Sequence, residues 1–244
     1  MYLGAASTLA HRVGWIAMSS RGVVSAVGPS LSISRVETAS EVREARELHA
    51  RVYLERRYVK ADEVDRGVLA TRVDPWAESA TYFLARSPTG RAVAVGRQIY
   101  SDDPAALPAL RLPGLDDGVV SQVQRQGGSR VVEISALAVH ATAPRDAAIQ
   151  LYSHMWLHSI ECEHTAWIMA IHPALARSIV GLLGPVIVPM GPPQWFMGSD
   201  VIPAVIWTDQ AAQIIHCTAA QSRDLPMRSR LPTLFPANDA VRRP

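Results

Sequence analysis

The pattern of hydrophobic and polar positions predicts three early strands: the first alternates the two kinds of residue, as a half-buried strand does, and the other two are rich in β-favouring residues. The first segment is LSISRVE at 31–37, and the other two are TYFLARS at 81–87 and RAVAVGRQIYS at 91–101. A Pro-Thr-Gly sequence at 88–90 separates the latter two. Because proline and glycine suit the centre of a tight turn, these two segments predict an antiparallel hairpin.

Between the first strand and the hairpin, the period changes to that of an amphipathic helix. Apolar residues recur at three- and four-residue spacing from Val42 to Val52, and Glu and Arg fill most other positions. Ser40 precedes this run and marks the predicted start of the helix. The following segment, 60–80, is polar and interrupted by glycine and proline. It predicts a loop and is the first place to expect substrate contacts.

The second half of the chain alternates strand-like and helical runs after a Pro/Gly/Asp-rich connection at 102–128. RVVEISALAVHA at 130–141 and AWIMAIH at 166–172 predict buried strands, and a helix that begins at Pro144 and extends to about Glu163 should connect them. The remaining elements are a helix at 173–183, a short strand at 186–191, a strand at 200–208 and a helix at 209–221. This order predicts the α/β (α+β mixed) class, with a central mixed, mostly antiparallel sheet flanked by helices.

The length and composition indicate one domain. The 244 residues are 48% hydrophobic and 19% charged, which is enough for one core, and residues 31–222 are predicted to form it. Residues 1–30 are rich in Ser, Gly and Ala and predict a flexible N-terminal extension, whereas 223–244 predict a Pro/Arg-rich tail. Because Met18 could be the native start, residues 1–17 are a candidate upstream extension.

The charge balance and the cysteines limit the partners and the compartment. With 24 Lys+Arg against 22 Asp+Glu, the net charge of +2 is too small to predict nucleic-acid binding. The two cysteines, Cys162 and Cys217, form no C-x-x-C motif, so reduced thiols in a cytoplasmic protein are expected. The sequence has no run of about 18 apolar residues and no signal-peptide pattern, so no integral membrane segment is predicted.

Three blocks of residues resemble a known group of enzymes. They comprise Arg51, Tyr53, Asp62 and Asp65 in the first helix and loop, Gly96 and Arg97 in the hairpin, and Glu133, Ser135, Ala138 and Val139 in VVEISALAV. In this order they are similar to blocks of acyl-homoserine-lactone (autoinducer) synthases and N-acyl amino acid synthases, which belong to the GNAT superfamily. The resemblance covers roughly residues 38–190. It implies the GNAT acyl-CoA N-acyltransferase fold and acyl transfer from a thioester to an amine.

Two departures from the family pattern affect the expected substrates. Acetyl-CoA enzymes of this superfamily carry a glycine-containing loop before the central helix, whereas residues 140–147 contain no glycine. Because glycines let backbone N–H groups approach a pyrophosphate closely, their absence favours an acyl-carrier-protein donor over acyl-CoA. The lactone synthases have arginine where this chain has Ala136. Amine acylation is therefore favoured over lactone formation from S-adenosylmethionine.

The predicted catalytic residues are Glu133 and Ser135. Strand alternation places both on one face, where a buried carboxylate could act as general base. The alternative for Glu133 is a structural ion pair with Arg97. The GNAT resemblance also implies that this strand separates from its parallel neighbour, which exposes backbone groups to the donor. The donor-binding residues predicted on this basis are Leu137, Ala138, Val139 and Arg145.

Acceptor-binding residues are predicted in the first helix, the loop and the hairpin. They are Arg51, Tyr53, Asp62, Asp65 and Arg97. Two arginines could hold a carboxylate through paired hydrogen bonds, whereas the aspartates could orient the amine or cap a short helix. Four aromatic residues could line an acyl tunnel or belong to the core. These are Tyr53, Trp76, Tyr82 and Phe83.

The segment HMWLHSIECEH offers an alternative chemistry. Its candidate metal ligands are His154, His158, Glu161 or Cys162, and His164. Their spacing of about one helical turn can suit zinc. However, Met155 stands where the H-E-x-x-H motif of a metalloprotease has glutamate, and the segment falls on the predicted central helix. A polar helix face without a metal is therefore favoured.

The sequence thus predicts an N-acyltransferase that moves a medium or long acyl group to the amine of an amino acid or similar small molecule. An acyl-carrier-protein or acyl-CoA thioester is the co-substrate, and no bound cofactor is expected. The alternatives are an acetyl-CoA-dependent acetyltransferase and a non-catalytic acyl-thioester sensor or scaffold. The acyl chain length, the amine and the oligomeric state stay open.

Overall fold

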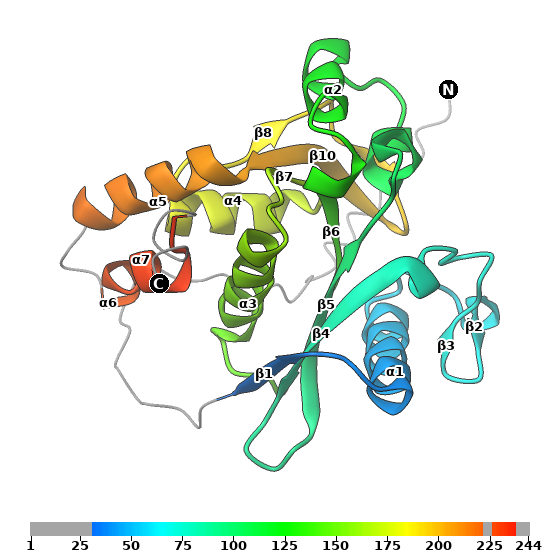
Figure 1. Cartoon of the computed structure of the whole chain (residues 1–244). Helices are drawn as coiled ribbons and strands as arrows, with labels where there is room; N and C mark the ends of the chain where they lie inside the picture. The colour runs from blue at the N-terminus through cyan, green and yellow to red at the C-terminus, as the bar shows by residue number, and fades with distance from the viewer. Residues whose placement is uncertain (1–30, 222–225, 238–244) are drawn as a thin grey trace, which may run out of the picture.

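An eight-stranded sheet is the frame of the structure, a computed structural model that describes residues 31–221 and 226–237 (Figure 1). Its strands are β1 Ser32–Arg35, β4 Ala80–Arg86, β5 Ala92–Ile99, β6 Val131–Val139, β7 Ala166–Ile171, β8 Val188–Pro189, β9 Gln194–Phe196 and β10 Ser199–Trp207. They are ordered β1-β4-β5-β6-β7-β10-β8, and β9 pairs with β10. The predicted extension 1–30, which includes the candidate upstream residues 1–17, lies outside the described residues.

Antiparallel pairing dominates this sheet. In the described part of the chain, every strand pair is antiparallel except β6 and β7. The hairpin predicted from the Pro-Thr-Gly turn is confirmed, because β4 pairs with β5 from Ala80 opposite Ile99 to Arg86 opposite Ala92. The mixed, mostly antiparallel sheet predicted from the sequence is therefore confirmed.

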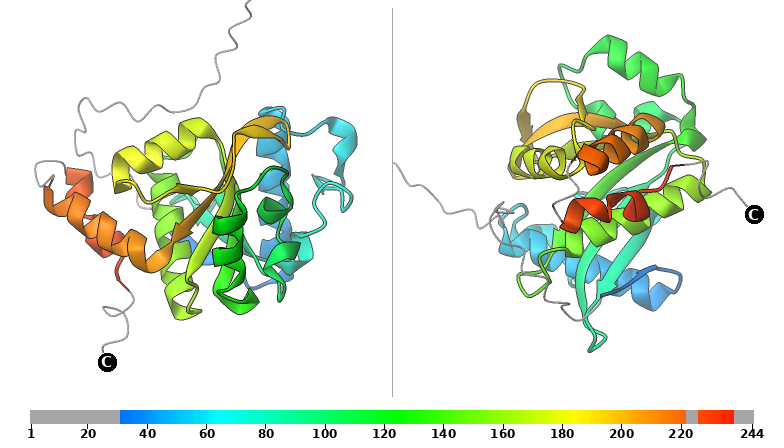
Figure 2. Two further views of the ribbon diagram at one scale, coloured as in Figure 1. Left: turned by 90° about the horizontal axis from the view of Figure 1, so that it is seen from above. Right: turned by 90° about the vertical axis from the view of Figure 1, so that its left-hand side faces the viewer.

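Helices cover both faces of the sheet (Figure 2). On one face lie α1 (Ala39–Glu55) and α2 (Asp117–Gln124), and on the other lie α3 (Ala147–Glu161), α4 (Pro173–Leu183) and α5 (Thr208–Gln221). The largest hydrophobic cluster fills the space between the sheet and α3, α4 and α5. This three-layer arrangement confirms the α/β class with flanking helices.

The start of α1 differs from the prediction by two residues. Thr38, rather than Ser40, caps the helix: the Glu41 N–H donates to Thr38 Oγ1 at 3.3 Å, and the Thr38 N–H donates to the Glu41 carboxylate at 3.1 Å. This reciprocal capping box requires a glutamate three residues after the cap. Thr38 has one, whereas Ser40 is followed at that distance by Arg43.

A bulge in β6 changes the direction of that strand. Val95 pairs with Ala138 and Arg97 with Ser135, so β6 has one residue more than β5 in this interval. Ala136 accommodates it with a φ of 51°, in the left-handed region that non-glycine residues rarely adopt. Opposite the bulge, a Cβ at Gly96 would lie 2.9 Å from the Met155 sulfur. Glycine at 96 therefore lets α3 pack closely against β5 at this point.

The sheet opens between β6 and β7 after Glu133, just before the bulge. The two strands pair only where Val131, Val132 and Glu133 face Ala166, Trp167 and Ile168. After these pairs β7 continues beside β10, whereas β6 stays with β5. The separation expected from the GNAT resemblance is thus present, and Glu133 is at the point where it begins.

Two segments that looked irregular in sequence contain additional structure. The 60–80 loop holds 3₁₀ turns at Ala61–Glu63 and Ala77–Ser79 and a small hairpin of β2 (Val64–Asp65) and β3 (Val68–Leu69). The 102–128 connection holds 3₁₀ turns at Pro104–Ala106 and Pro108–Arg111, followed by α2. The turn that contains Ala109 packs against β6, which brings its backbone to Glu133.

The segment 226–237, which the sequence assigned to a Pro/Arg-rich tail, packs against the core. It contains α6 (Pro226–Ser229) and α7 (Leu231–Leu234), and the side chains of Leu231 and Phe235 are buried in the cluster of α3, α4 and α5. Among the described residues, no helix combines the length and the apolarity needed to span a bilayer.

Candidate active site

The opening between β6 and β7 contains a cavity of about 130 Å³. Its walls come from both faces of the sheet, because the two strands no longer touch there. The wall on the α1 face includes His49, Tyr53, Asp74, Arg97, Glu133 and Ser135, and the wall on the α3 face includes Tyr152, Met169, Ile171 and Leu175. The turn between β9 and β10 adds Phe196, Met197 and Ser199. The cavity therefore extends through the sheet.

Glu133 is a buried carboxylate in the wall of this cavity. Its side chain accepts a hydrogen bond from the Ala109 N–H at 2.8 Å, and the residue is 2% exposed. Burial raises the pKa of Glu133 to about 8, against smaller opposing effects of the Ala109 N–H and the Arg97 charge. Glu133 is therefore mostly protonated at pH 7 and becomes a strong carboxylate base just above it.

Arg97 is held by a different acid. Its Nη1 donates to Asp74 Oδ2 at 2.6 Å and to the Tyr82 hydroxyl at 3.3 Å, and its Nε donates to Ser135 Oγ at 2.8 Å. Burial alone would lower the pKa of Arg97, but the Asp74 carboxylate raises it above its usual value. The ion pair considered between Glu133 and Arg97 is thus replaced, in the described residues, by one between Asp74 and Arg97.

Two polar atoms in the cavity wall have no hydrogen-bond partner within the described chain. They are Asp74 Oδ1 and His49 Nε2, and both residues are almost fully buried. Burial, with the Arg97 and Arg46 charges, holds the pKa of His49 well below its usual value, so its ring is neutral. Unpaired buried polar atoms each cost about 1–3 kcal/mol. A bound ligand that donates to Asp74 and contacts His49 would remove this cost.

Neither His49 nor Asp74 was predicted as a site residue, although each carries a partial signal. His49 is four residues after Ala45 on the buried side of α1, where an unpaired histidine is out of place. Asp74 lies in the 60–80 segment in which substrate contacts were expected, directly before Pro75. Only the three-dimensional structure brings these residues, from separate elements, beside Arg97.

The aromatic residues considered for an acyl tunnel divide into two groups. Tyr53 and Trp76 line the cavity, whereas Tyr82 and Phe83 are buried in the hydrophobic core. Burial raises the pKa of Tyr53 to about 12, and its ring meets the edge of His49 at a centroid distance of 4.2 Å. Tyr53 therefore offers a neutral hydroxyl and an apolar ring to the cavity.

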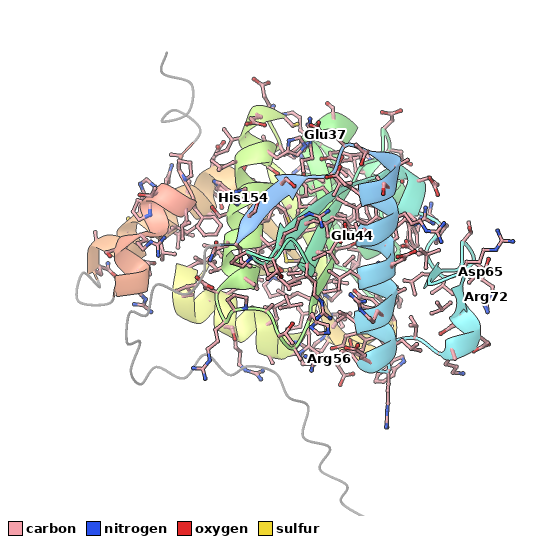
Figure 3. All side chains as sticks on the ribbon, turned by 90° about the horizontal axis from the view of Figure 1, so that it is seen from below. Glu37, Glu44, Arg56, Asp65, Arg72 and His154 are labelled. Carbon is pink, nitrogen blue, oxygen red and sulfur yellow. The ribbon has the colours of Figure 1, made fainter. Side chains whose placement is uncertain are left out.

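Several predicted site residues lie outside the cavity wall. Arg51, Asp62, Asp65 and Arg145 are exposed, and Ala138 and Val139 do not line the cavity. Figure 3 shows Asp65 and Arg72 at the outer edge of the molecule. Arg72 pairs loosely with Asp62 at 3.9 Å. Of the predicted residues, the cavity brings together Tyr53, Arg97, Glu133, Ser135 and Leu137.

The backbone of β6 adds polar groups to the site. A strand hydrogen-bonds on both edges, and β6 loses its partner on the β7 side after Glu133. Alternate N–H and C=O groups of residues 134–139 therefore face the opening. The bulge at Ala136, which also lines the cavity, changes their direction. Such groups can hydrogen-bond a thioester and its carbonyl oxygen, as expected for Leu137.

The histidine-rich face of α3 shows local contacts. His158 lies 3.6 Å from the Glu161 carboxylate and 3.6 Å from the Cys162 sulfur, and His154 contacts the Gln150 carbonyl at 3.0 Å. In the residues that the structure describes, no group of three or more His, Cys, Asp or Glu is arranged to hold a metal.

Comparison with known proteins identifies the fold. No protein-family model matches the sequence, and no curated protein matches it. Among solved structures, FeeM, an N-acyl amino acid synthase from uncultured soil microbes, is 17% identical with a TM-score of 0.59, over 76% of this chain and 95% of that one. The CoA-dependent acyl-homoserine lactone synthase BjaI, solved with SAM and isopentyl-CoA, is 14% identical with a TM-score of 0.59, over 84% and 100%.

The AHL synthase LasI is also similar, with 14% identity and a TM-score of 0.53 over 73% of this chain and 89% of that one. At such identities the likeness concerns the fold. The chain therefore has the fold of these GNAT-like acyltransferases, and both the predicted fold and the predicted resemblance are confirmed.

Proposed function

We propose that the protein is an acyltransferase that joins an acyl group, delivered as a thioester, to the amine of an amino acid or similar small molecule. The observation that supports this most strongly is Glu133, a buried carboxylate with a pKa of about 8 in the wall of a cavity that extends through the sheet. The solved structures that share the fold include an N-acyl amino acid synthase and acyl-homoserine lactone synthases.

Glu133 has the proton affinity that this reaction needs. With a pKa of about 8, an ionised Glu133 is a much stronger base than an ordinary glutamate, so it can accept a proton from the incoming ammonium at a smaller free-energy cost. The neutral nitrogen attacks the thioester carbon, the C–N bond forms and the C–S bond breaks. The second amine proton goes to the departing thiolate, and Glu133 returns its proton to solvent.

Ser135 is placed to support the same step. Because Arg97 Nε donates to Ser135 Oγ, the hydroxyl hydrogen of Ser135 is left for another acceptor. A developing oxyanion or thiolate in the cavity would supply that acceptor, together with the backbone groups of β6 near Leu137. This gives Glu133 and Ser135 the catalytic roles expected from the sequence.

The acceptor amine is assigned to the wall formed by Asp74 and His49. An ammonium or amine has several N–H donors, so it can pair with Asp74 Oδ1 while another hydrogen is directed to Glu133. Arg97, which lines the same cavity, supplies the positive charge for a carboxylate of the acceptor. Arg51, Asp62 and Asp65, which lie outside the cavity wall, have no role in this arrangement.

The donor is proposed to be a medium or long acyl group on a carrier protein or on CoA. Apolar side chains such as Met169, Ile171 and Leu175 line the α3 side of the cavity, which suits an alkyl chain better than an acetyl group. The glycine-free loop before α3 favours the carrier protein.

A thiol-release assay tests this proposal. Acyl-carrier-protein thioesters, long-chain acyl-CoA and acetyl-CoA are each offered with pooled amino acids, and products are identified by mass. We expect thiol release with an N-acyl product from the longer donors. Preference for acetyl-CoA would indicate an ordinary acetyltransferase instead. Thioester binding without any thiol release would indicate a sensor and contradict the proposal.

A further inference from the structure

A second, smaller cavity adjoins the candidate active site. Its volume is about 20 Å³, and the side-chain surface that faces it is entirely apolar. Tyr152 of α3 and Met169 of β7 line both cavities, so these two side chains form the boundary between them. Beyond that boundary the small cavity lies among α3, α4 and α5, in the largest hydrophobic cluster. An apolar group that passed Tyr152 and Met169 would enter it.

The C-terminal segment supplies part of the wall of the small cavity, together with α4, α5 and β10. Phe235 lines it, is 1% exposed, and meets the Trp156 ring edge-on at a centroid distance of 5.7 Å. Two side chains of α3 hold the segment in place: Ser153 Oγ donates to the Leu234 carbonyl at 2.7 Å, and Trp156 Nε1 donates to the Pro236 carbonyl at 3.0 Å.

We propose that the small cavity is the distal end of the acyl site and that Phe235 determines how long an acyl chain the enzyme accepts. This rests on the proposed acyl transfer. A cavity of about 20 Å³ has room for little more than one water-sized group. With Phe235 in place, a chain whose carbonyl lies at the β6 opening therefore ends just beyond Tyr152 and Met169. The substrate class is accordingly a medium-length, unbranched acyl thioester.

The test is the dependence of kcat/KM on chain length, measured with straight-chain acyl thioesters from butanoyl to hexadecanoyl. Phe235→Ala removes the ring that closes the cavity, so the optimum should move to longer chains. For a chain a few methylenes longer, we expect kcat/KM to rise by about tenfold or more relative to kcat/KM for the original optimum. Ala211→Val narrows the cavity from α5 and should move the optimum to shorter chains.

Phe83→Ala is the matched control. Phe83 is 2% exposed and belongs to the same hydrophobic cluster, but it lines neither cavity. Its replacement should lower stability without moving the chain-length optimum. If Phe235→Ala does not fold, Ala211→Val decides the matter alone. An unchanged optimum in the folded cavity variants would show that the cavity is only a packing void and would overturn the proposal.

A binding measurement separates this inference from the proposed function. Trp156 and Trp167 line the small cavity, so a thioester whose chain ends in bromine should quench their fluorescence. The quenching should be reduced in a Trp156→Phe variant, and Phe235→Ala should shift the best-quenching chain to a longer one. This result without thiol release would contradict acyl transfer but keep the cavity as a chain-binding site. Thiol release without such quenching would overturn the assignment of the cavity.

Discussion

Arg97 and Asp74 form an ion pair of 2.6 Å in which the two side chains are only 5% and 2% exposed. The pair fixes Arg97 against Ser135 and keeps the guanidinium from pairing with Glu133. Burial is the largest effect on the pKa of Glu133 and raises it to about 8, against smaller lowering effects of the Ala109 N–H and the Arg97 charge.

The first prediction concerns the stability of this pair. Asp74→Asn would leave the Arg97 charge buried without a partner, which should lower the free energy of unfolding by about 3–5 kcal/mol. Urea denaturation measures this change. Asp62→Asn is the control, because Asp62 pairs with Arg72 on the surface and its loss should cost about 0.5 kcal/mol or less. An equal decrease in the free energy of unfolding in the two variants would mean that the buried ion pair stabilises the protein no more than the surface pair does.

The second prediction concerns the pH dependence of activity. If ionised Glu133 is the base, kcat/KM should rise with pH with a midpoint near the Glu133 pKa of about 8, and it should fall again at the higher pH at which the acceptor ammonium loses its proton. A pH-rate profile measures this midpoint, and an enzyme-free blank at each pH corrects for spontaneous hydrolysis of the thioester. A midpoint near 4.5, the ordinary value for glutamate, would show that Glu133 is not held in its buried, protonated state.

The third prediction concerns stability and pH. The pKa of Glu133 is higher in the folded protein than the value of 4.5 expected when unfolded, so its protonated form favours folding. The contribution of this protonation to the free energy of unfolding is fully present below about pH 4.5, decreases as the pH rises and is lost once the pH passes about 8. The slope is at most about 1.4 kcal/mol per pH unit. Denaturation of the wild type and of Glu133→Gln across this range measures it: the free energy of unfolding of the wild type minus that of the variant should fall as the pH rises, because the subtraction removes the buried histidines common to both.

The sequence predicts a feature of this molecule well when the residues involved are close together along the chain, and poorly when they come from separate elements. Strand alternation placed Glu133 and Ser135 on one face of β6, and the structure puts both in the cavity wall. The pairing of Arg97 with Asp74 could not be predicted, because the two residues come from a strand and an irregular loop.

The sequence also does not predict the burial of isolated apolar residues in the C-terminal segment. Leu231 and Phe235 stand among prolines and arginines with no helical period, so the segment resembled a tail, although both side chains are buried. Arg51 and Asp65 were chosen by similarity of pattern, and they are exposed outside the cavity. A sequence pattern identifies an element more reliably than the direction of each of its side chains.

The fourth prediction concerns the turn between β9 and β10. Gly198 has a φ of 77°, and a Cβ there would lie 2.6 Å from the Tyr58 carbonyl oxygen. Gly198→Ala should therefore displace the turn, move Phe196 and Met197 away from the cavity, and raise KM for the acyl thioester. Steady-state kinetics measures this effect.

Gly90→Ala is the control for this turn. Gly90 has a similar φ of 80°, but a Cβ there would meet nothing within 4 Å. Both substitutions carry backbone strain of about 1 kcal/mol, whereas only Gly198→Ala forces the turn away from Tyr58. A KM raised equally in both variants would mean that strain, and not the closure of the cavity, is responsible.

The most direct test is the rate of N-acyl product formation, followed by mass spectrometry, in the wild type, Glu133→Gln and Glu55→Gln. Glutamine at 133 can keep the hydrogen bond from Ala109 but cannot accept a proton, whereas Glu55 is exposed at the end of α1. We predict that Glu133→Gln lowers kcat by about 100-fold or more and that Glu55→Gln leaves it unchanged. Wild-type rates of product formation in Glu133→Gln would contradict the assignment of Glu133 as the base.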